Sequence, residues 1–204
     1  MRDFYSKGRS TVFAENGMCA TSHPIAAQAA VDVLKDGGNA MDAAIAGAVL
    51  LGICEPQMTG IGGDCFVLFS PAGRDDVLAM NGSGRAPANL TADKLREAGH
   101  DKVPLRDPSA VTIPTAIDAF CTLSEDWGKL GLDRILQPAI QYARNGVAVA
   151  PRVGYDWSNL LDTFHKTAIP FFTNNGSAPA TGTRFSYPGQ AEVIETIAAQ
   201  GRDG

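Results

Sequence analysis

Cysteine and histidine are the side chains of this chain best suited to nucleophilic or metal chemistry, and their spacing decides whether such chemistry is expected. The 204-residue sequence has four cysteines in apolar contexts such as GMCAT and GDCFVLF, and no two are spaced as a metal-binding pair. Nothing in the sequence links a cysteine to a histidine as nucleophile and base. We expect buried free thiols, no metal site and a reducing compartment. The residues concerned are Cys19, Cys54, Cys65 and Cys121, with His23, His100 and His165.

A glycine-rich turn, Gly60-Ile61-Gly62-Gly63, invites comparison with phosphate-binding loops. Such loops follow a strand and open a helix, so that helix N-terminal amides face the anion. Here a helical pattern precedes the glycines and a strand pattern follows them, which disfavours a nucleotide site. The glycines are expected to let backbone pass close to backbone. The functional alternative is that the backbone amides of this turn line part of a substrate cleft.

Threonine hydroxyls are a third possible source of a nucleophile. Thr21, Thr59, Thr112 and Thr115 all fall at expected helix or strand starts, where caps and turn hydrogen bonds are their usual use. The sequence therefore favours a structural role over a catalytic one for these four threonines.

Composition is ordinary for a globular protein, with 45% hydrophobic and 19% charged residues. The formal net charge of -5, the pI near 5.1 and the absence of a Lys/Arg run argue against nucleic-acid or anionic-membrane binding. Small molecules are the expected partners. The amino-terminal MRDFYSKGRSTVF has no apolar core of signal-peptide length, so a cytoplasmic location is expected, with the periplasm as the alternative if a leader was removed.

The elements that must position any site begin with two helices and a hairpin. Ser22 and Pro24 are expected to open a helix through Lys35, after a short strand at 17–21. Gly37 is expected to end that helix and Asn39 to be the N-cap of the next, with Asp42 completing a capping pattern for an apolar Ala/Gly helix. Residues 65–69 and 77–80, joined by turn residues, predict an antiparallel hairpin. This pattern favours a layered α+β fold over a doubly wound parallel sheet.

Downstream, the patterns predict helices at 115–127, opened by Thr-x-x-Asp, and at 138–145, ending at Gly146. A long surface loop is expected over 169–190, before a short helix at 191–199. No internal repeat or domain boundary is visible, so residues 1–204 are treated as one domain.

Six sequence blocks in order resemble the large subunit of the γ-glutamyltransferase family. They are GMCATSHPIAAQAAVDVLKDGGNAMDAAIA, EPQMTGIGGDCFVLF, NGSGRAP, VTIPTAIDAF, WGKLGLDRILQPAIQYARNGVAVA and ETIAAQGRDG. The resemblance implies the N-terminal nucleophile hydrolase superfamily and a four-layer αββα sandwich. It also implies a precursor that cleaves itself, and a threonine freed at the start of the small subunit that forms an acyl-enzyme without metal or cofactor.

In such a protein the catalytic part lies further along than residue 204, so the resemblance makes this chain a partial domain and implies that it holds no catalytic residue. Its partners would be the remaining large-subunit segment and the small subunit. The activity expected is transfer or hydrolysis of a γ-glutamyl group from a glutathione-type amide. Alternatives are a related oxamate or cephalosporin amidohydrolase, or a non-catalytic scaffold if the native chain ends here.

One family function is expected inside the chain. The family's large subunit supplies an arginine for the substrate α-carboxylate, in a motif resembling Arg-Glu-x-Ala-Pro, because a guanidinium offers planar bidentate donors. Aligning that motif on Ala86-Pro87 places Ser83 where the arginine should be, with Arg85 displaced by two positions. In an extended segment both side chains lie on the same side. Ser83 and Arg85 are therefore the candidate substrate-binding residues. A structural partner or loop cap for Arg85 is the alternative, and the departure leaves the substrate open.

Overall fold

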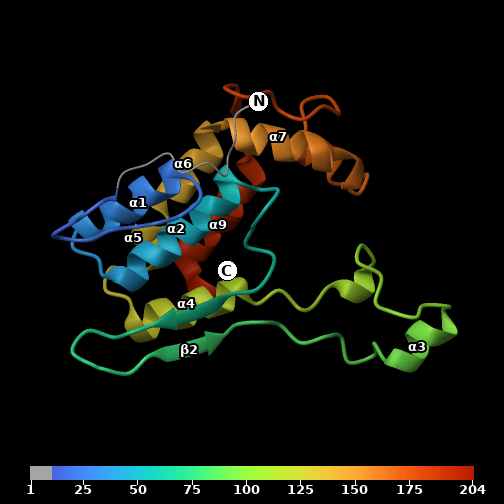
Figure 1. Cartoon of the computed structure of the whole chain (residues 1–204), viewed down its shortest axis with the longest axis horizontal. Helices are drawn as coiled ribbons and strands as arrows, with labels where there is room; N and C mark the ends of the chain where they lie inside the picture. The colour runs from blue at the N-terminus through green and yellow to red at the C-terminus, as the bar shows by residue number, and fades with distance from the viewer. Residues whose placement is uncertain (1–10) are drawn as a thin grey trace.

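The computed structural model describes residues 11–204 as a cluster of helices, with a hairpin along one side and a long extended arm (Figure 1). The helices are α1 Pro24–Lys35, α2 Ala40–Cys54, α3 Ala92–Glu97, α4 Ala116–Trp127, α5 Leu132–Ile135, α6 Gln137–Asn145, α7 Pro151–Leu160, α8 Ile169–Phe172 and α9 Pro188–Gln200. The strands are β1 Phe66–Phe69, β2 Leu78–Asn81, β3 Val147–Ala148 and β4 Arg184–Phe185, and the 3-10 turns are Pro108–Ala110, Leu161–Thr163 and Gly201–Asp203.

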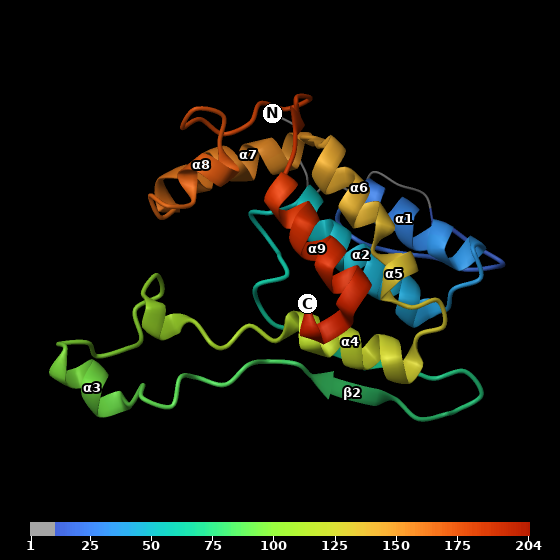
Figure 2. The ribbon, with the colours of Figure 1, turned by 180° about the vertical axis from the view of Figure 1, so that it is seen from behind.

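Helix α2 is the centre of the core, as its near absence of charge predicted. It contacts α1, α4, α5 and α6, and Figure 2 shows α9 crossing the same cluster from the other side. Small residues permit the close packing: a Cβ placed on Gly47 would lie 3.6 Å from the Cβ of Ala30 in α1. The predicted N-cap Asn39 and capping box with Asp42 are confirmed, and α1 ends at Lys35, just before Gly37 with φ of +94°.

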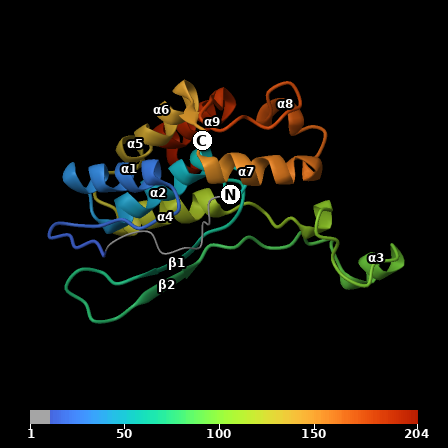
Figure 3. The ribbon, with the colours of Figure 1, turned by 45° about the horizontal axis from the view of Figure 1, so that its top comes forward.

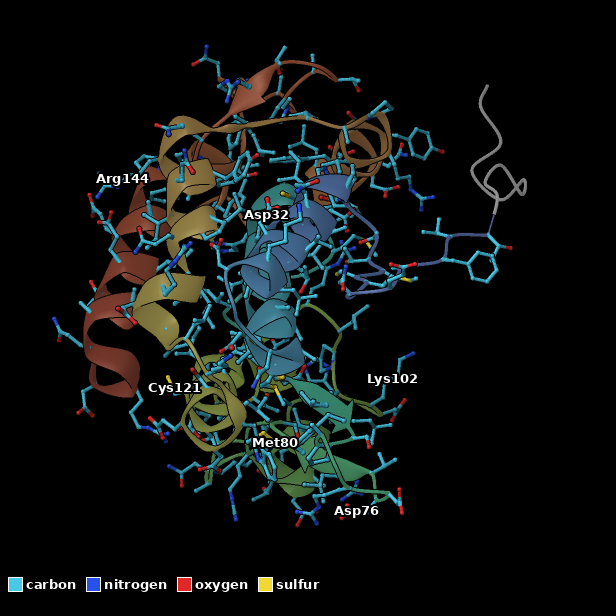
Figure 4. The ribbon with its side chains drawn as sticks, turned by 90° about the vertical axis from the view of Figure 1, so that its left-hand side faces the viewer. Asp32, Asp76, Met80, Lys102, Cys121 and Arg144 are labelled. Carbon is cyan, nitrogen blue, oxygen red and sulfur yellow. The ribbon has the colours of Figure 1, made fainter. Side chains whose placement is uncertain are left out.

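The predicted hairpin is confirmed, with β1 and β2 antiparallel and Phe66 opposite Asn81. Figure 3 shows it as a separate layer beside α4. Its inner face packs on the helices, since the ring centroids of Phe69 and Trp127 lie 5.0 Å apart in an edge-to-face arrangement. Figure 4 places Met80 within this hairpin and Asp76 at its turn. The observed architecture is mixed, with many helices and few strands, in agreement with the α+β expectation.

Several local predictions were wrong or incomplete. Residues 17–21 form no strand, because no described segment pairs with them. The N-cap of α1 is His23 rather than Ser22, whose hydroxyl donates instead to Glu55 at 2.6 Å. The loop expected at 169–190 contains α8 and β4, and the helix expected at 191–199 begins earlier, at Pro188.

Helix α7 was not predicted, although its burial is clear in the structure. Trp157 is 1% exposed, stacks on Tyr187, and donates from Nε1 to the carbonyl of Phe172 at 3.0 Å. Its partners come from segments far along the chain, so the local pattern alone does not reveal them. At the outer side of this cluster, Arg144 of α6 (Figure 4) donates from Nε to Glu195 of α9 at 2.7 Å.

Residues 82–114 form the arm, which leaves β2, carries α3 at its far end and returns to the start of α4 (Figures 1 and 2). Its outgoing and returning segments meet near the body, where the N–H of Ile113 donates to the carbonyl of Arg85 at 3.0 Å. Among residues 11–204, no helix is long and apolar enough to cross a membrane.

Candidate functional site

The segment NGSGRAP lies where the arm leaves the hairpin, and its first residues are held by short-range hydrogen bonds. The Asn81 side-chain oxygen accepts from the Ser83 N–H at 3.0 Å and from the Ser83 hydroxyl at 2.7 Å. The single proton of the Ser83 hydroxyl is thus already committed. Ser83 remains exposed and keeps lone pairs that can accept a hydrogen bond from a ligand.

Arg85 has no anionic partner among residues 11–204, a property that it shares with Arg106 of the arm and with Arg184, which bonds only to backbone carbonyls. Its side chain is exposed, and among residues 11–204 no hydrogen bond or ion pair to its guanidinium is found. By contrast, Arg74 pairs with Asp76 and Arg96 pairs with Asp93. The structural carboxylate that was the alternative for Arg85 is therefore not among the described residues. A planar cation on a fixed backbone is suited to binding a carboxylate.

The glycine-rich turn at residues 60–63 contacts the start of α4. The carbonyl of Gly63 accepts from the backbone N–H groups of Thr115 and Ala116, at 3.0 and 3.1 Å. The close passage of backbone predicted for the turn is found at Gly60, whose Cα would lie 3.2 Å from a Cβ placed on Gly52 of α2. The turn, the segment NGSGRAP and the start of α4 thus converge.

Thr115 was the residue of this junction whose role the sequence misassigned. It precedes α4 as predicted, but its hydroxyl makes no cap and donates instead to the carbonyl of Gly82 at 2.6 Å. Nothing local in Thr-x-x-Asp distinguishes the two outcomes, because Gly82 lies 33 residues away. The nearest signal was the pair of glycines in Gly82-Ser83-Gly84, which indicates a tightly packed backbone.

The cysteines are poorly suited to nucleophilic catalysis. All four are free, and burial raises the pKa of the Cys54 thiol to about 12, with the Glu55 carboxylate adding to the shift. Burial also raises the pKa values of Cys65 and Cys121. A reactive cysteine needs the opposite shift, toward the thiolate. Within residues 11–204, no group of three or more His, Cys, Asp or Glu side chains is arranged to hold a metal ion.

A concave region of about 690 Å³ lies elsewhere in the molecule, between α8 and the start of α9. It is largely apolar, with Phe171 and Val193 at its wall. Its arginine, Arg184, is already used, because the guanidinium donates to the carbonyl of Gly146 at 2.8 Å. This region offers no free charge comparable to that of Arg85.

Comparison with known proteins gives consistent matches along nearly the whole chain. The crystal structure of a cephalosporin acylase from Bacillus halodurans superposes with a TM-score of 0.90 and 37% identity, over 98% of this chain and 39% of that one. The glutathione hydrolase-like YwrD proenzyme of Bacillus subtilis is 37% identical over 94% of this chain and 37% of its own length. The oxamate amidohydrolase proenzyme of Klebsiella pneumoniae is 30% identical over 95% of this chain and 38% of its own length.

The fold and these matches define the class: the chain is an amino-terminal part of a large subunit in the N-terminal nucleophile hydrolase superfamily. The family model described as gamma-glutamyltranspeptidase matches residues 26–204, and the chain therefore belongs to the gamma-glutamyltranspeptidase family. It spans a little over a third of the length of the curated relatives, at 37% and 38%.

Proposed function

We propose that the full-length protein containing this chain hydrolyses or transfers a γ-glutamyl group from a glutathione-type amide. In the proposed reaction, a threonine at the start of the small subunit attacks the amide carbonyl, and its own α-amino group takes the hydroxyl proton. The amine leaves with that proton, and an ester-linked acyl-enzyme remains. Water or a second amine then releases the acyl group. The family membership of this chain supports the proposal.

The contribution of this chain is recognition of the substrate, with Arg85 binding its α-carboxylate. The observation that carries this role is the unpartnered, exposed guanidinium of Arg85, attached to a backbone whose carbonyl is held by the N–H of Ile113. Ser83 lies two residues earlier, and its oxygen can accept a hydrogen bond from the substrate's ammonium group. No residue of this chain is assigned to the chemical step, and the mechanism uses no metal or cofactor.

The same family fold accounts for the apolar outer face of the hairpin. Phe66 is 66% and Leu68 is 75% exposed, which is unusual for two neighbouring positions on one face of a strand pair. In the proposed four-layer αββα sandwich, this face packs against a second sheet. That sheet would come from the rest of the large subunit and the small subunit, which are the proposed partners. The free cysteines support a cytoplasmic location.

A related amidohydrolase is the second candidate, favoured by one specific observation. Ser83 occupies the position of the family's arginine, so the cation comes from a point two residues further along the chain. A carboxylate placed differently from that of a γ-glutamyl group then fits equally well. A structure named as a cephalosporin acylase has the same fold as this chain, and a relative named as an oxamate amidohydrolase is similar to it in sequence.

Substitution of Arg85 in the full-length protein tests the proposed site. Arg85→Ala is expected to raise the KM for a γ-glutamyl anilide by about 30- to 100-fold, the loss of a charge-assisted hydrogen-bond pair, with a smaller effect on kcat. Arg85→Lys restores part of the loss, because the charge remains but the planar fork does not. Arg96→Ala, which removes a paired arginine of the arm, is the matched control. An unchanged KM in Arg85→Ala rejects the role.

The same assay, run with different amides, distinguishes a γ-glutamyl enzyme from a related amidohydrolase. Faster turnover of a cephalosporin side-chain amide or of oxamate than of the γ-glutamyl anilide, with the same dependence on Arg85, selects the amidohydrolase. If the mature protein cleaves none of them, the non-catalytic scaffold is the correct interpretation.

A further inference from the structure

The backbone that precedes Arg85 is fixed at Gly82 from two sides. The N–H of Gly82 donates to the carbonyl of Cys65 at 2.7 Å, which extends the hairpin pairing past β2. The carbonyl of Gly82 accepts from the hydroxyl of Thr115 at 2.6 Å. Gly82 is thereby bonded both to Cys65, just before β1, and to Thr115, just before α4.

Glycine is required at this point and again two residues later. A Cβ on Gly82 would lie 2.7 Å from the Cβ of Ala119, and a Cβ on Gly84 would lie 1.6 Å from the carbonyl oxygen of Ile113. Neither position accepts a side chain without movement of the backbone. The segment between them therefore has little freedom to shift while these contacts persist.

The hydroxyl of Thr115 is not needed for the helix that it precedes. Its own N–H and that of Ala116 donate to the carbonyl of Gly63, so the turn supplies the acceptor at this helix end. A hydrophobic residue of the same shape would leave those bonds in place. The 2.6 Å bond to Gly82 is the interaction that specifically uses the hydroxyl.

We propose that Thr115 is a positioning residue for substrate recognition: its hydroxyl fixes the Gly82 carbonyl and so sets where the Arg85 guanidinium stands. The proposal rests on the proposed role of Arg85. Arg85 lies three positions after Gly82, which is about 10 Å along an extended chain, so a loosened Gly82 moves the guanidinium relative to the substrate carboxylate. Bidentate binding depends on geometry, and such movement weakens it.

The test compares Thr115→Val, which removes the hydroxyl at constant shape, with Thr115→Ser, which keeps it. Both are made in the full-length protein, alone and combined with Arg85→Ala. For a carboxylate-bearing γ-glutamyl anilide, Thr115→Val is expected to raise KM about tenfold, the loss of one hydrogen bond, with kcat changed less than about twofold. Thr115→Ser keeps the wild-type KM. Combined with Arg85→Ala, Thr115→Val adds no further increase in KM.

A matched control exists in the same helix. Thr122 of α4 also donates its hydroxyl to a backbone carbonyl, that of Asp118 at 3.0 Å, but this bond lies within the helix. Thr122→Val is expected to leave KM unchanged. An equal rise in KM in both valine variants would show a general effect on α4 and would overturn the positioning role.

The outcomes separate this inference from the proposed function. If Arg85→Ala raises KM and Thr115→Val does not, only the positioning role is rejected. If Thr115→Val raises KM equally in the wild type and in Arg85→Ala, the substitution does not act through Arg85, and the inference is likewise rejected. If Arg85→Ala has no effect, the site and its positioning residue are both rejected. Should Thr115→Val fail to mature, Thr115→Ala is assayed in its place. Failure of both to mature assigns the hydroxyl to folding and overturns the inference.

Discussion

Asn39 and Asp42 exchange hydrogen bonds at the start of α2. The carboxylate of Asp42 accepts from the N–H of Asn39 at 2.9 Å, while the side-chain oxygen of Asn39 accepts from the N–H of Asp42 at 3.1 Å. The same carboxylate also accepts from the backbone N–H groups of Lys129 at 3.0 Å and Leu130 at 3.3 Å, in the link between α4 and α5. One fully buried acid thus joins the central helix to a segment far along the chain.

Asp42→Asn is expected to lower the free energy of unfolding by about 2–3 kcal/mol, because an amide group would face backbone N–H donors that then lack an acceptor. Urea denaturation of purified protein measures the change. Asp32→Asn, at an exposed position of α1, is the control and should change stability by less than about 0.5 kcal/mol. Equal effects at the two positions would contradict the role of Asp42.

The two parts of this cluster were not equally predictable. The capping box follows from residue types three positions apart, so the sequence predicted it correctly. The bonds from Lys129 and Leu130 join residues 87 and 88 positions away, and no local pattern encodes that distance. The misassigned Thr115 has the same cause, because a distant Gly82 carbonyl competes with the helix end for its hydroxyl. Arg85, in contrast, is proposed from its residue type and its motif, and its role stays a prediction.

His23 is expected to make stability depend on pH below neutrality. The residue is 3% exposed, its Nδ1 accepts from the N–H of Ile25 at 3.3 Å, and burial lowers its pKa, partly offset by the Glu55 carboxylate. Below about pH 6.5 the unfolded chain takes up a proton that the folded histidine resists, so stability falls with falling pH until the folded pKa is passed.

The free energy of unfolding of His23→Asn, measured from about pH 7.5 down to about pH 5, checks this dependence, because that range brackets the ordinary histidine pKa of about 6.5. Asparagine keeps a cap acceptor but does not titrate in this range, so its stability curve should be flatter than that of the unsubstituted chain. His100→Asn, at an exposed site, should retain the original slope. Identical slopes for all three proteins would rule out His23 as the source.

The thiols should differ sharply in their reactivity. With a pKa of about 12, Cys54 is a thiolate in about one molecule in ten thousand at pH 8, and it is only 2% exposed. Cys121 is fully buried, whereas Cys19 is half-buried. Titration with a disulfide reagent, followed by peptide mapping, should label Cys19 first and Cys54 and Cys121 only after addition of denaturant. Rapid native labelling of Cys54 would contradict the observed packing.

The outer face of the hairpin provides a test of the proposed sandwich. Leu68 is 75% exposed in this chain, so Leu68→Asp would cost little if that face were open to water in the full-length protein. If a second sheet covers it, a charge is buried there without a partner, and the free energy of unfolding should fall by about 2 kcal/mol or more. Ser70→Asp adds the same charge just beyond β1, at an exposed polar position, and should be nearly neutral. Thermal and urea unfolding of the mature protein distinguish the two arrangements, because a covered face predicts a loss confined to Leu68, whereas an open face predicts two equally small effects.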